Sequence, residues 1–185
     1  MAVQLAKRLI SVDEYHTMAE AGILTTDDRV ELIHGEILEM SPIGKKHRST
    51  VIKIENNLKE LFGNKALISV QNPININDLN EPEPDVAILK TRKDFYDNHA
   101  ILPDDIYLII EVSDTTHQVD KEVKLPLYAV GSIPEYWIVN LAAEQIEVYT
   151  HPSNGRYKKM EIFDKSDSIP MGFCKSEIRV DQLVS

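Results

Sequence analysis

Two acidic residues and one lysine have the types and the positions that phosphodiester hydrolysis requires. Asp85 follows Pro84 at the start of an apolar segment, and Glu111 lies at the end of the apolar run 106–112. If the two segments are neighbouring strands whose ends meet, the carboxylates can share one Mg²⁺ ion, with Mn²⁺ as a substitute. Mg²⁺ commonly takes one or two protein carboxylates and keeps several waters. A cation near the scissile phosphate would complete the site.

The cation candidate is Lys124. Asp120, Lys124 and Tyr128 are spaced four residues apart, which places them on one face of a helix that follows the Glu111 strand. That face could cover the strand end, where an unpaired Glu111 would be costly to desolvate. An ordinary Asp120–Lys124 pair on a wet surface explains the same spacing, and the spacing alone favours this simpler interpretation.

The elements that must position these residues follow from hydrophobic periodicity and turn signals. Ser11 and Glu14 form a capping-box pattern that predicts a helix through about residue 21. His34 and Gly35 predict the turn of a hairpin over 29–40. Further helices are expected over 46–62 and 119–130, with a kink or a new start at Pro126. Strands are expected over 66–71, 73–77, 84–90, 106–112, 135–139, 145–149 and 157–163, with a polar loop or short helix over 91–105 and a closing segment near 178–183.

This order of elements predicts one domain over residues 1–185, of the α/β (α+β) class, with a mixed central sheet flanked by helices and with an N-terminal helix and hairpin. No repeat or linker divides the chain.

The net charge of −10 and the pI near 5.0 are unusual for a protein that binds nucleic acid, because neutralising phosphate drives that binding. Basic residues do cluster at 45–48, 90–93 and 156–159, where a solvated surface is the simplest interpretation. A carboxylate-rich metal site also makes a protein more acidic before the ion binds. The charge weakens the case for DNA without removing it.

Other sequence features exclude several classes of protein. The apolar runs are too short to span a membrane, and no secretory signal is recognisable, so we expect a cytoplasmic protein without membrane partners. Cys174 is the only cysteine, which excludes an internal disulfide and a cysteine-based zinc cluster. The HExxH, GxSxG and P-loop strings do not occur.

Segments 83–89, 109–116 and 120–140, which read EPDVAIL, IIEVSDTT and DKEVKLPLYAVGSIPEYWIVN, resemble the Uma-two family of restriction-endonuclease-like proteins. Segment 29–37 and the helix near His47 also match, so the resemblance covers most of the chain. It implies a restriction-endonuclease-like core of the PD-(D/E)XK nuclease superfamily with the order αβββαβ, a divalent metal, and a site built from Asp85 and Glu111. Ser113 replaces the lysine that usually follows the glutamate by two residues. The family supplies that lysine from the next helix, which implies Lys124 rather than Lys121.

The resemblance also implies Glu31 and His47 as additional site residues. Glu31 could equally be an ordinary strand carboxylate, and His47 could cap or salt-bridge its own helix. We expect Ser113 to cap the following helix and Trp137 to pack in the core. Four other histidines show no ligand spacing and are expected at the surface: His34, His99, His117 and His151.

Two hypotheses follow. The first is a Mg²⁺-dependent endonuclease that hydrolyses DNA, with Asp85 and Glu111 as metal ligands and Lys124 as the catalytic cation. The second is a catalytically inactive nuclease fold retained for binding or assembly, which the acidic charge favours. A homodimer is plausible for either, because enzymes that cut both strands often pair two sites.

Overall fold

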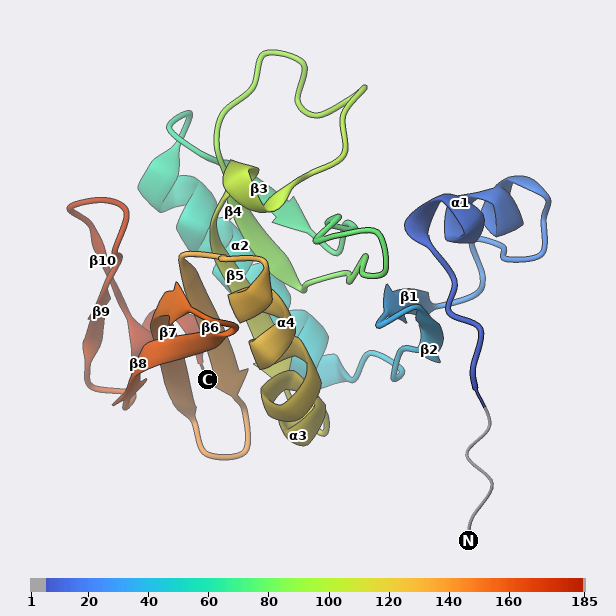
Figure 1. The fold of residues 1–185 in the computed structure, drawn as a ribbon. Helices are drawn as coiled ribbons and strands as arrows, with labels where there is room; N and C mark the ends of the chain where they lie inside the picture. The colour runs from blue at the N-terminus through green and yellow to red at the C-terminus, as the bar shows by residue number, and fades with distance from the viewer. Residues whose placement is uncertain (1–5, 185) are drawn as a thin grey trace, which may run out of the picture.

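The computed structural model describes residues 6–184, so residues 1–5 and 185 of the expected domain lie outside the described residues. Its centre is a six-stranded mixed sheet in the order β3-β4-β5-β6-β7-β8 (Figure 1). The strands are β3 (Leu67–Val70), β4 (Val86–Leu89), β5 (Ile106–Ser113), β6 (Glu135–Asn140), β7 (Gln145–Ser153) and β8 (Arg156–Phe163). All neighbours are antiparallel except β5 and β6, which are parallel. A parallel pair needs a crossover connection, and residues 114–134 supply it.

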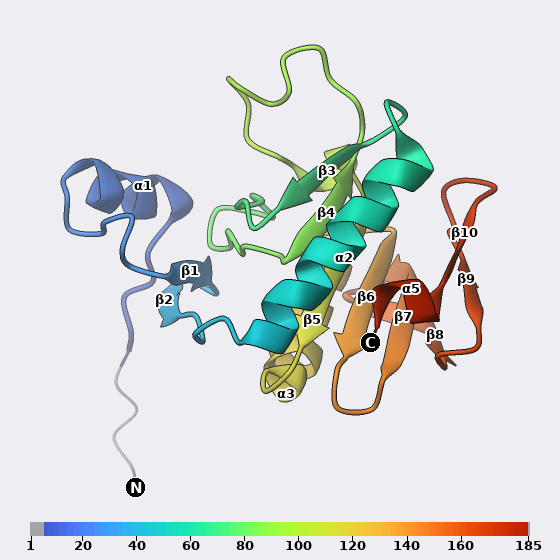
Figure 2. The same cartoon turned by 180° about the vertical axis from the view of Figure 1, so that it is seen from behind.

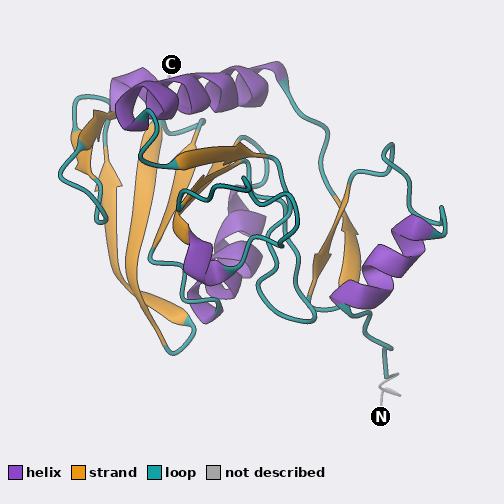
Figure 3. Ribbon diagram, turned by 90° about the horizontal axis from the view of Figure 1, so that it is seen from above, coloured by secondary structure: helices purple, strands orange, loops and turns teal. Residues whose placement is uncertain are grey.

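Helices cover both faces of this sheet. The long helix α2 (Lys45–Phe62) crosses one face, as Figure 2 shows, and the helical crossover lies on the opposite face (Figure 3). The apolar residues of α2 recur at helical spacing and are buried against the sheet: Val51, Ile54, Leu58 and Phe62. The helix ends at Gly63, whose φ of +52° suits a residue without a side chain.

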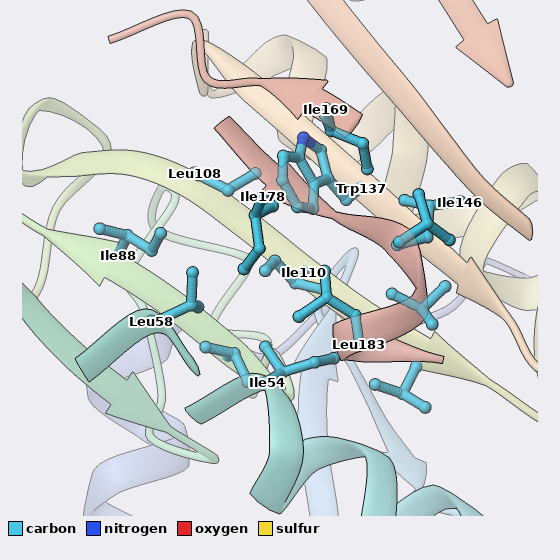
Figure 4. Close-up of a cluster of buried hydrophobic side chains, with 14 of the residues drawn as sticks. Ile54, Leu58, Ile88, Leu108, Ile110, Trp137, Ile146, Ile169, Ile178 and Leu183 are labelled. Atoms are coloured by element: carbon cyan, nitrogen blue, oxygen red, sulfur yellow. The ribbon is translucent and has the colours of Figure 1, made fainter. Parts of the chain in front are cut away.

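The alternation of side chains along the strands creates one apolar cluster on each face. Residues with even numbers in β4, such as Ile88, pack under α2, whereas Ala87 and Leu89 face the crossover. Figure 4 shows the α2 cluster, in which Trp137 is completely buried, as expected for core packing. Asp85 and Glu111 have odd numbers and follow the alternation onto the crossover face.

The N-terminal elements form a small unit beside the main sheet (Figures 1 and 2). Helix α1 (Val12–Glu20) begins with the predicted capping box of Ser11 and Glu14. Strands β1 (Val30–Ile33) and β2 (Glu36–Glu39) form the predicted hairpin, with positive φ at His34 and Gly35. Backbone hydrogen bonds between Leu32 and Glu81 attach the hairpin to the segment that leads into β4.

The remaining elements close the fold. A short 3₁₀ turn, η1 (Pro103–Asp105), precedes β5, in agreement with the loop or short helix expected over 91–105. Strands β9 (Ser168–Pro170) and β10 (Glu177–Arg179) pair with each other, and α5 (Val180–Leu183) packs Leu183 into the α2 cluster. Among residues 6–184, none of the helices combines the length and the apolar character that a bilayer crossing demands.

The strand expected over 73–77 does not form. Ile74 and Ile76 are buried as their alternation suggests, but their amides bond to the carbonyls of Pro82 and Asn80 in the returning chain rather than to the sheet. The alternating pattern of residues 73–77 therefore belongs to an irregular loop that packs on the core.

The helix expected over 119–130 is divided into three parts: α3 (His117–Val119), a π-helical turn η2 (Asp120–Lys124), and α4 (Leu125–Val130). Pro126 has no amide hydrogen to continue the α-helical ladder. In the turn before it, the amide of Leu125 bonds to the carbonyl of Asp120, five residues back. The expected effect of Pro126 is confirmed, because α4 starts beside it.

Candidate active site

Asp85 and Glu111 face each other across β4 and β5. The register pairs Val86 with Ile110, and one further step places Asp85, the residue before β4, opposite Glu111 near the end of β5. The amide of Val112 donates to Asp85 Oδ2 at 2.8 Å, and the amide of Asp85 donates to Glu111 Oε2 at 3.4 Å. The two carboxylates are only 9% and 3% exposed, so like charges meet in a site that is largely shielded from water.

Lys124 is the cation of this site. Its Nζ lies 3.0 Å from Glu111 Oε1 and 3.4 Å from Glu31 Oε2, and the residue is 6% exposed. The simpler interpretation, a wet surface pair with Asp120, is wrong: both residues are buried, and Lys124 bonds to the glutamates. The π-helical turn between Asp120 and Lys124 changes the spacing on which that pair depended.

Tyr128, one turn of α4 further on, completes the set around Glu111. Its hydroxyl donates to Glu111 Oε1 at 2.9 Å. Lys124 and Tyr128 therefore bond to the same carboxylate oxygen, while the other oxygen accepts the amide of Asp85.

His47 enters from the first turn of α2. Its Nε2 lies 2.9 Å from Asp85 Oδ2, so it pairs across the site and does not cap its own helix, whose N-cap is Gly44. The other ring nitrogen, Nδ1, is buried and is the single side-chain atom in residues 6–184 that is buried without a hydrogen-bond partner. Gln71 adds a weaker contact, from Nε2 to Asp85 Oδ1 at 3.4 Å.

Glu31 reaches the site from β1 of the N-terminal unit. Its Oε2 accepts the amide of Glu83 at 3.2 Å and lies near the ammonium of Lys124. It is therefore more than an ordinary strand carboxylate, because it joins the hairpin to the main sheet at the site. The half-buried side chain of Glu83 adds a further carboxylate, and burial, followed by the charge of Glu31, raises its pKa.

Ser113 does not cap the next helix as expected. Its hydroxyl donates to Asp120 Oδ2, which also accepts Thr116 Oγ1 at 2.9 Å. Asp120 is buried and is held by hydroxyl groups at the start of the crossover. Ser113 thus anchors the segment that leads to Lys124.

The electrostatics of the site are dominated by an excess of buried negative charge. Burial raises the pKa of Glu111 to about 8; the nearby ammonium of Lys124 opposes this shift, and Asp85 and Asp120 add to it. Burial alone would lower the pKa of Lys124, but Glu111, Glu31 and Asp120 outweigh it and raise that pKa, so the amine stays charged. The hydrogen bond to Asp85 raises the pKa of His47.

These side chains line a cleft of about 330 Å³ between the N-terminal hairpin, the start of α2 and the crossover. The cleft contains seven carboxylates: Glu31, Glu39, Glu83, Asp85, Glu111, Asp114 and Asp120. Arg29, Lys124 and His47 are its basic residues. A cation would therefore lower the electrostatic cost of the cleft.

The donor set fits a hard divalent cation that keeps most of its water. Within residues 6–184, no three His, Cys, Asp or Glu side chains form a ready-made metal cage. Mg²⁺ does not require such a cage, because one or two carboxylates with waters suffice. Asp85 and Glu111 provide this pair, and the raised pKa of Glu111 indicates that its charge lacks full compensation.

The other residues singled out from the sequence lie outside this set. Lys121 bonds to Glu147 Oε2 at 2.9 Å, whereas Lys124 lies beside Glu111 and Glu31. His117 is half-buried rather than a free surface residue, with Nε2 2.8 Å from Glu147 Oε1. The other three histidines expected at the surface are exposed: His34, His99 and His151.

Gln71 and Glu83 were not predicted. Glu83 lies two residues before Asp85 in the EPEPD segment, so the extended alternation across two prolines could have indicated it. Gln71 has no comparable signal, because its side chain reaches Asp85 only through a positive φ of 50° just after β3.

Comparison with known proteins gives one family and a matching fold. The family model Uma2, described as "Putative restriction endonuclease", matches residues 12–179. A crystal structure titled as that of a putative nuclease belonging to DUF820 from Anabaena variabilis superposes with a TM-score of 0.73 at 16% identity, covering 94% of this chain and 97% of that one. No curated protein matches the chain. At that identity the structural likeness shows a shared fold.

Proposed function

The chain belongs to the Uma2 family, whose description is that of a restriction endonuclease, and from this premise we propose that it is a metal-dependent endonuclease that hydrolyses DNA. One observation carries the proposal: Asp85 and Glu111 meet across two strands, and the buried amine of Lys124 lies 3.0 Å from Glu111. Two carboxylates and an amine in one cleft are the groups that metal-assisted phosphodiester hydrolysis uses.

Each residue has a distinct role in the proposal. Asp85 and Glu111 would hold the Mg²⁺ ion, which when bound supplies Lewis-acid stabilisation of charge on the phosphate. Hydrolysis forms a bond from a water oxygen to phosphorus and breaks one phosphorus–oxygen ester bond, while negative charge grows on the phosphate oxygens. The ammonium of Lys124 stabilises that charge. Glu31 holds Lys124 in place from the hairpin.

His47 has a supporting role at Asp85. The hydrogen bond to Asp85 raises the pKa of His47, which favours the protonated ring, with Nε2 2.9 Å from Asp85 Oδ2. We expect this proton to fix the orientation of the Asp85 carboxylate.

Cleavage of plasmid and linear duplex DNA in Mg²⁺ or Mn²⁺ tests the proposal. We expect Asp85→Asn and Glu111→Gln to lower the rate at least about a hundredfold, as removal of a group that stabilises transition-state charge does. The exposed residues Asp97 and Glu122 provide matched controls. Asp97→Asn and Glu122→Gln should cleave at the rate of the unaltered protein.

Retention of metal-dependent cleavage in both Asp85→Asn and Glu111→Gln would exclude this mechanism. Metal titrations by calorimetry provide a readout that does not need the correct DNA sequence. Mn²⁺ should bind the unaltered chain and bind Glu111→Gln much more weakly.

A second candidate function is a nuclease fold that binds without cutting. The observation that favours it is the ratio of seven carboxylates to three basic residues in the cleft, which would repel phosphate unless a metal binds. Thermal unfolding separates the two, because a ligand stabilises the state that it binds. Stabilisation by Mn²⁺ that disappears in Glu111→Gln supports the enzyme, whereas no stabilisation at millimolar metal supports the binding module.

A further inference from the structure

Strand β8 forms an unusually exposed edge of the main sheet. It pairs with β7 on one side and is the last strand of the sheet on the other. Within the described part of the chain, its backbone makes no hydrogen bonds beyond those of this pairing. Six of its eight residues are exposed, including Met160 at 47% and Ile162 at 51%. Unpaired strand edges are templates for another strand.

From this edge we infer that a second copy of the chain pairs with β8, antiparallel, about a two-fold axis that passes beside Met160. The pairing joins the two sheets into one continuous sheet. The inference does not depend on the proposed nuclease activity, because the candidate active site lies at β4 and β5, on the other side of β6 and β7.

The sequence of β8 is self-complementary about Met160. In this register each Lys159 lies opposite the Glu161 of the other copy. Opposite charges directly across two strands are favourable. Within one chain Lys159 and Glu161 already lie on the same face, with a contact of 2.6 Å.

The ends of the pairing are also complementary. Each Arg156 lies opposite Asp164, the residue just after β8, and each Lys158 lies opposite Ile162. The long aliphatic part of Lys158 can cover Ile162 while its ammonium stays in water. The register therefore buries exposed apolar surface without placing like charges opposite each other.

Neighbouring registers are disfavoured by charge. A two-fold axis normal to the sheet pairs residues that point to the same face, so its centre must fall on a residue. A centre on Lys158 or Lys159 places two lysines opposite each other, and a centre on Glu161 does the same with two glutamates. Like charges directly opposite are destabilising.

Lysine on a sheet edge ordinarily prevents pairing. In β8, Lys159 lies opposite Glu161 of the other copy. The charge of Lys159 therefore disfavours pairing with other strands but favours pairing with a second β8. The strand edge is selective because its affinity for a strand with matching charges exceeds its affinity for a strand with mismatched charges.

Sedimentation over a range of chain concentrations tests the inference. We expect a monomer–dimer equilibrium, and Glu161→Lys should raise the dimer dissociation constant about tenfold, because two symmetry-related pairs become repulsive. The double variant Lys159→Glu/Glu161→Lys restores opposite charges and should return the constant close to its original value. Glu60→Lys, the same change on the exposed face of α2, is the matched control and should have no effect.

Cysteine cross-linking tests the register itself, in a Cys174→Ser background. Met160→Cys places two thiols across the axis, within the range of a disulfide, and should give a covalent dimer under oxidation. Ile162→Cys places them several residues apart and should not. A chain that stays monomeric at every concentration would overturn the inference. So would a dimer that resists Glu161→Lys, or one that cross-links through residue 162 and not through residue 160.

Discussion

Lys124 Nζ and Glu111 Oε1 lie 3.0 Å apart, and both residues are almost entirely buried. The amine belongs to a π-helical turn and the carboxylate to a central strand, so the crossover brings them together rather than proximity in sequence. A buried pair of this kind stabilises little in net terms but is costly to break, because one partner is left as an uncompensated charge.

Removal of Lys124 should therefore destabilise the protein more than removal of both partners. We expect Lys124→Met to lower the free energy of unfolding by about 3–5 kcal/mol above pH 8, where Glu111 is ionised, and by less below pH 8, where Glu111 holds a proton. The double variant Lys124→Met/Glu111→Gln should recover a substantial part of this loss. Urea unfolding measures all three chains, and a double variant less stable than Lys124→Met would contradict the buried pair.

The metal-free protein should lose stability as the pH rises from about 5 to about 8. Glu111 has a pKa of about 8 in the folded state and an ordinary value of 4.5, so the folded chain binds the extra proton between these values. Stability is therefore highest below pH 4.5 for this group and declines up to about pH 8, by at most about 1.4 kcal/mol per pH unit for one proton. His47, whose pKa is also raised, acts in the same direction.

Thermal unfolding in a chelator, repeated across this pH range, measures the effect. Glu111→Gln cannot titrate, so its curve should be flatter than that of the unaltered protein. A stability that rises between pH 5 and pH 8 in both chains would show that other groups dominate.

Tyr128 should contribute to the stability of the protein through one hydrogen bond. Tyr128→Phe removes the hydroxyl that donates to Glu111 Oε1 but keeps the buried ring. Above pH 8, where Glu111 is ionised, the expected cost is about 1.5–3 kcal/mol, the range for hydrogen bonds to charged groups. Tyr15→Phe is the comparison, because Tyr15 donates to a backbone carbonyl away from Glu111. Metal affinity should change only in Tyr128→Phe, as measured by Mn²⁺ calorimetry.

The apolar face of α2 provides a prediction for the fold itself. Leu58 is fully buried, whereas Ile52 on the same helix is 49% exposed. Leu58→Ala should cost about 2–5 kcal/mol from lost burial and a cavity. Ile52→Ala should stay within about 0.5 kcal/mol of the unaltered protein, as surface substitutions usually do. Equal costs at the two positions would contradict the placement of α2.

Much of the fold could be predicted from the sequence because its signals are local. The capping box at Ser11, the turn at His34 and Gly35, and the apolar stripe of α2 each depend on neighbours within a few residues. The strand expected over 73–77 failed because alternation reports which side chains are buried, not which strand accepts the hydrogen bonds. Ile74 is buried in a loop that bonds to itself.

The candidate site was predictable in its residues but not in its contacts. Asp85 and Glu111 lie at strand ends, which a sequence pattern can indicate. The partner of Lys124 depends on the π-helical turn, and helical spacing assumes α-helical geometry, so Asp120 was the natural but wrong choice. The contact between Glu31 and Lys124 joins residues from separate units, and no local pattern encodes it.

The parallel seam between β5 and β6 divides the sheet into two antiparallel meanders, β3-β4-β5 and β6-β7-β8. Both carboxylates that face each other belong to the first meander, whereas Lys124 lies in the connection that spans the seam. Since pairings between nearby segments generally form sooner than distant ones, we expect the acids to meet before their counter-ion arrives. Burial would then raise the pKa of Glu111 with no ammonium nearby to oppose it, and closing the seam would bring in Lys124, which lowers that pKa in part.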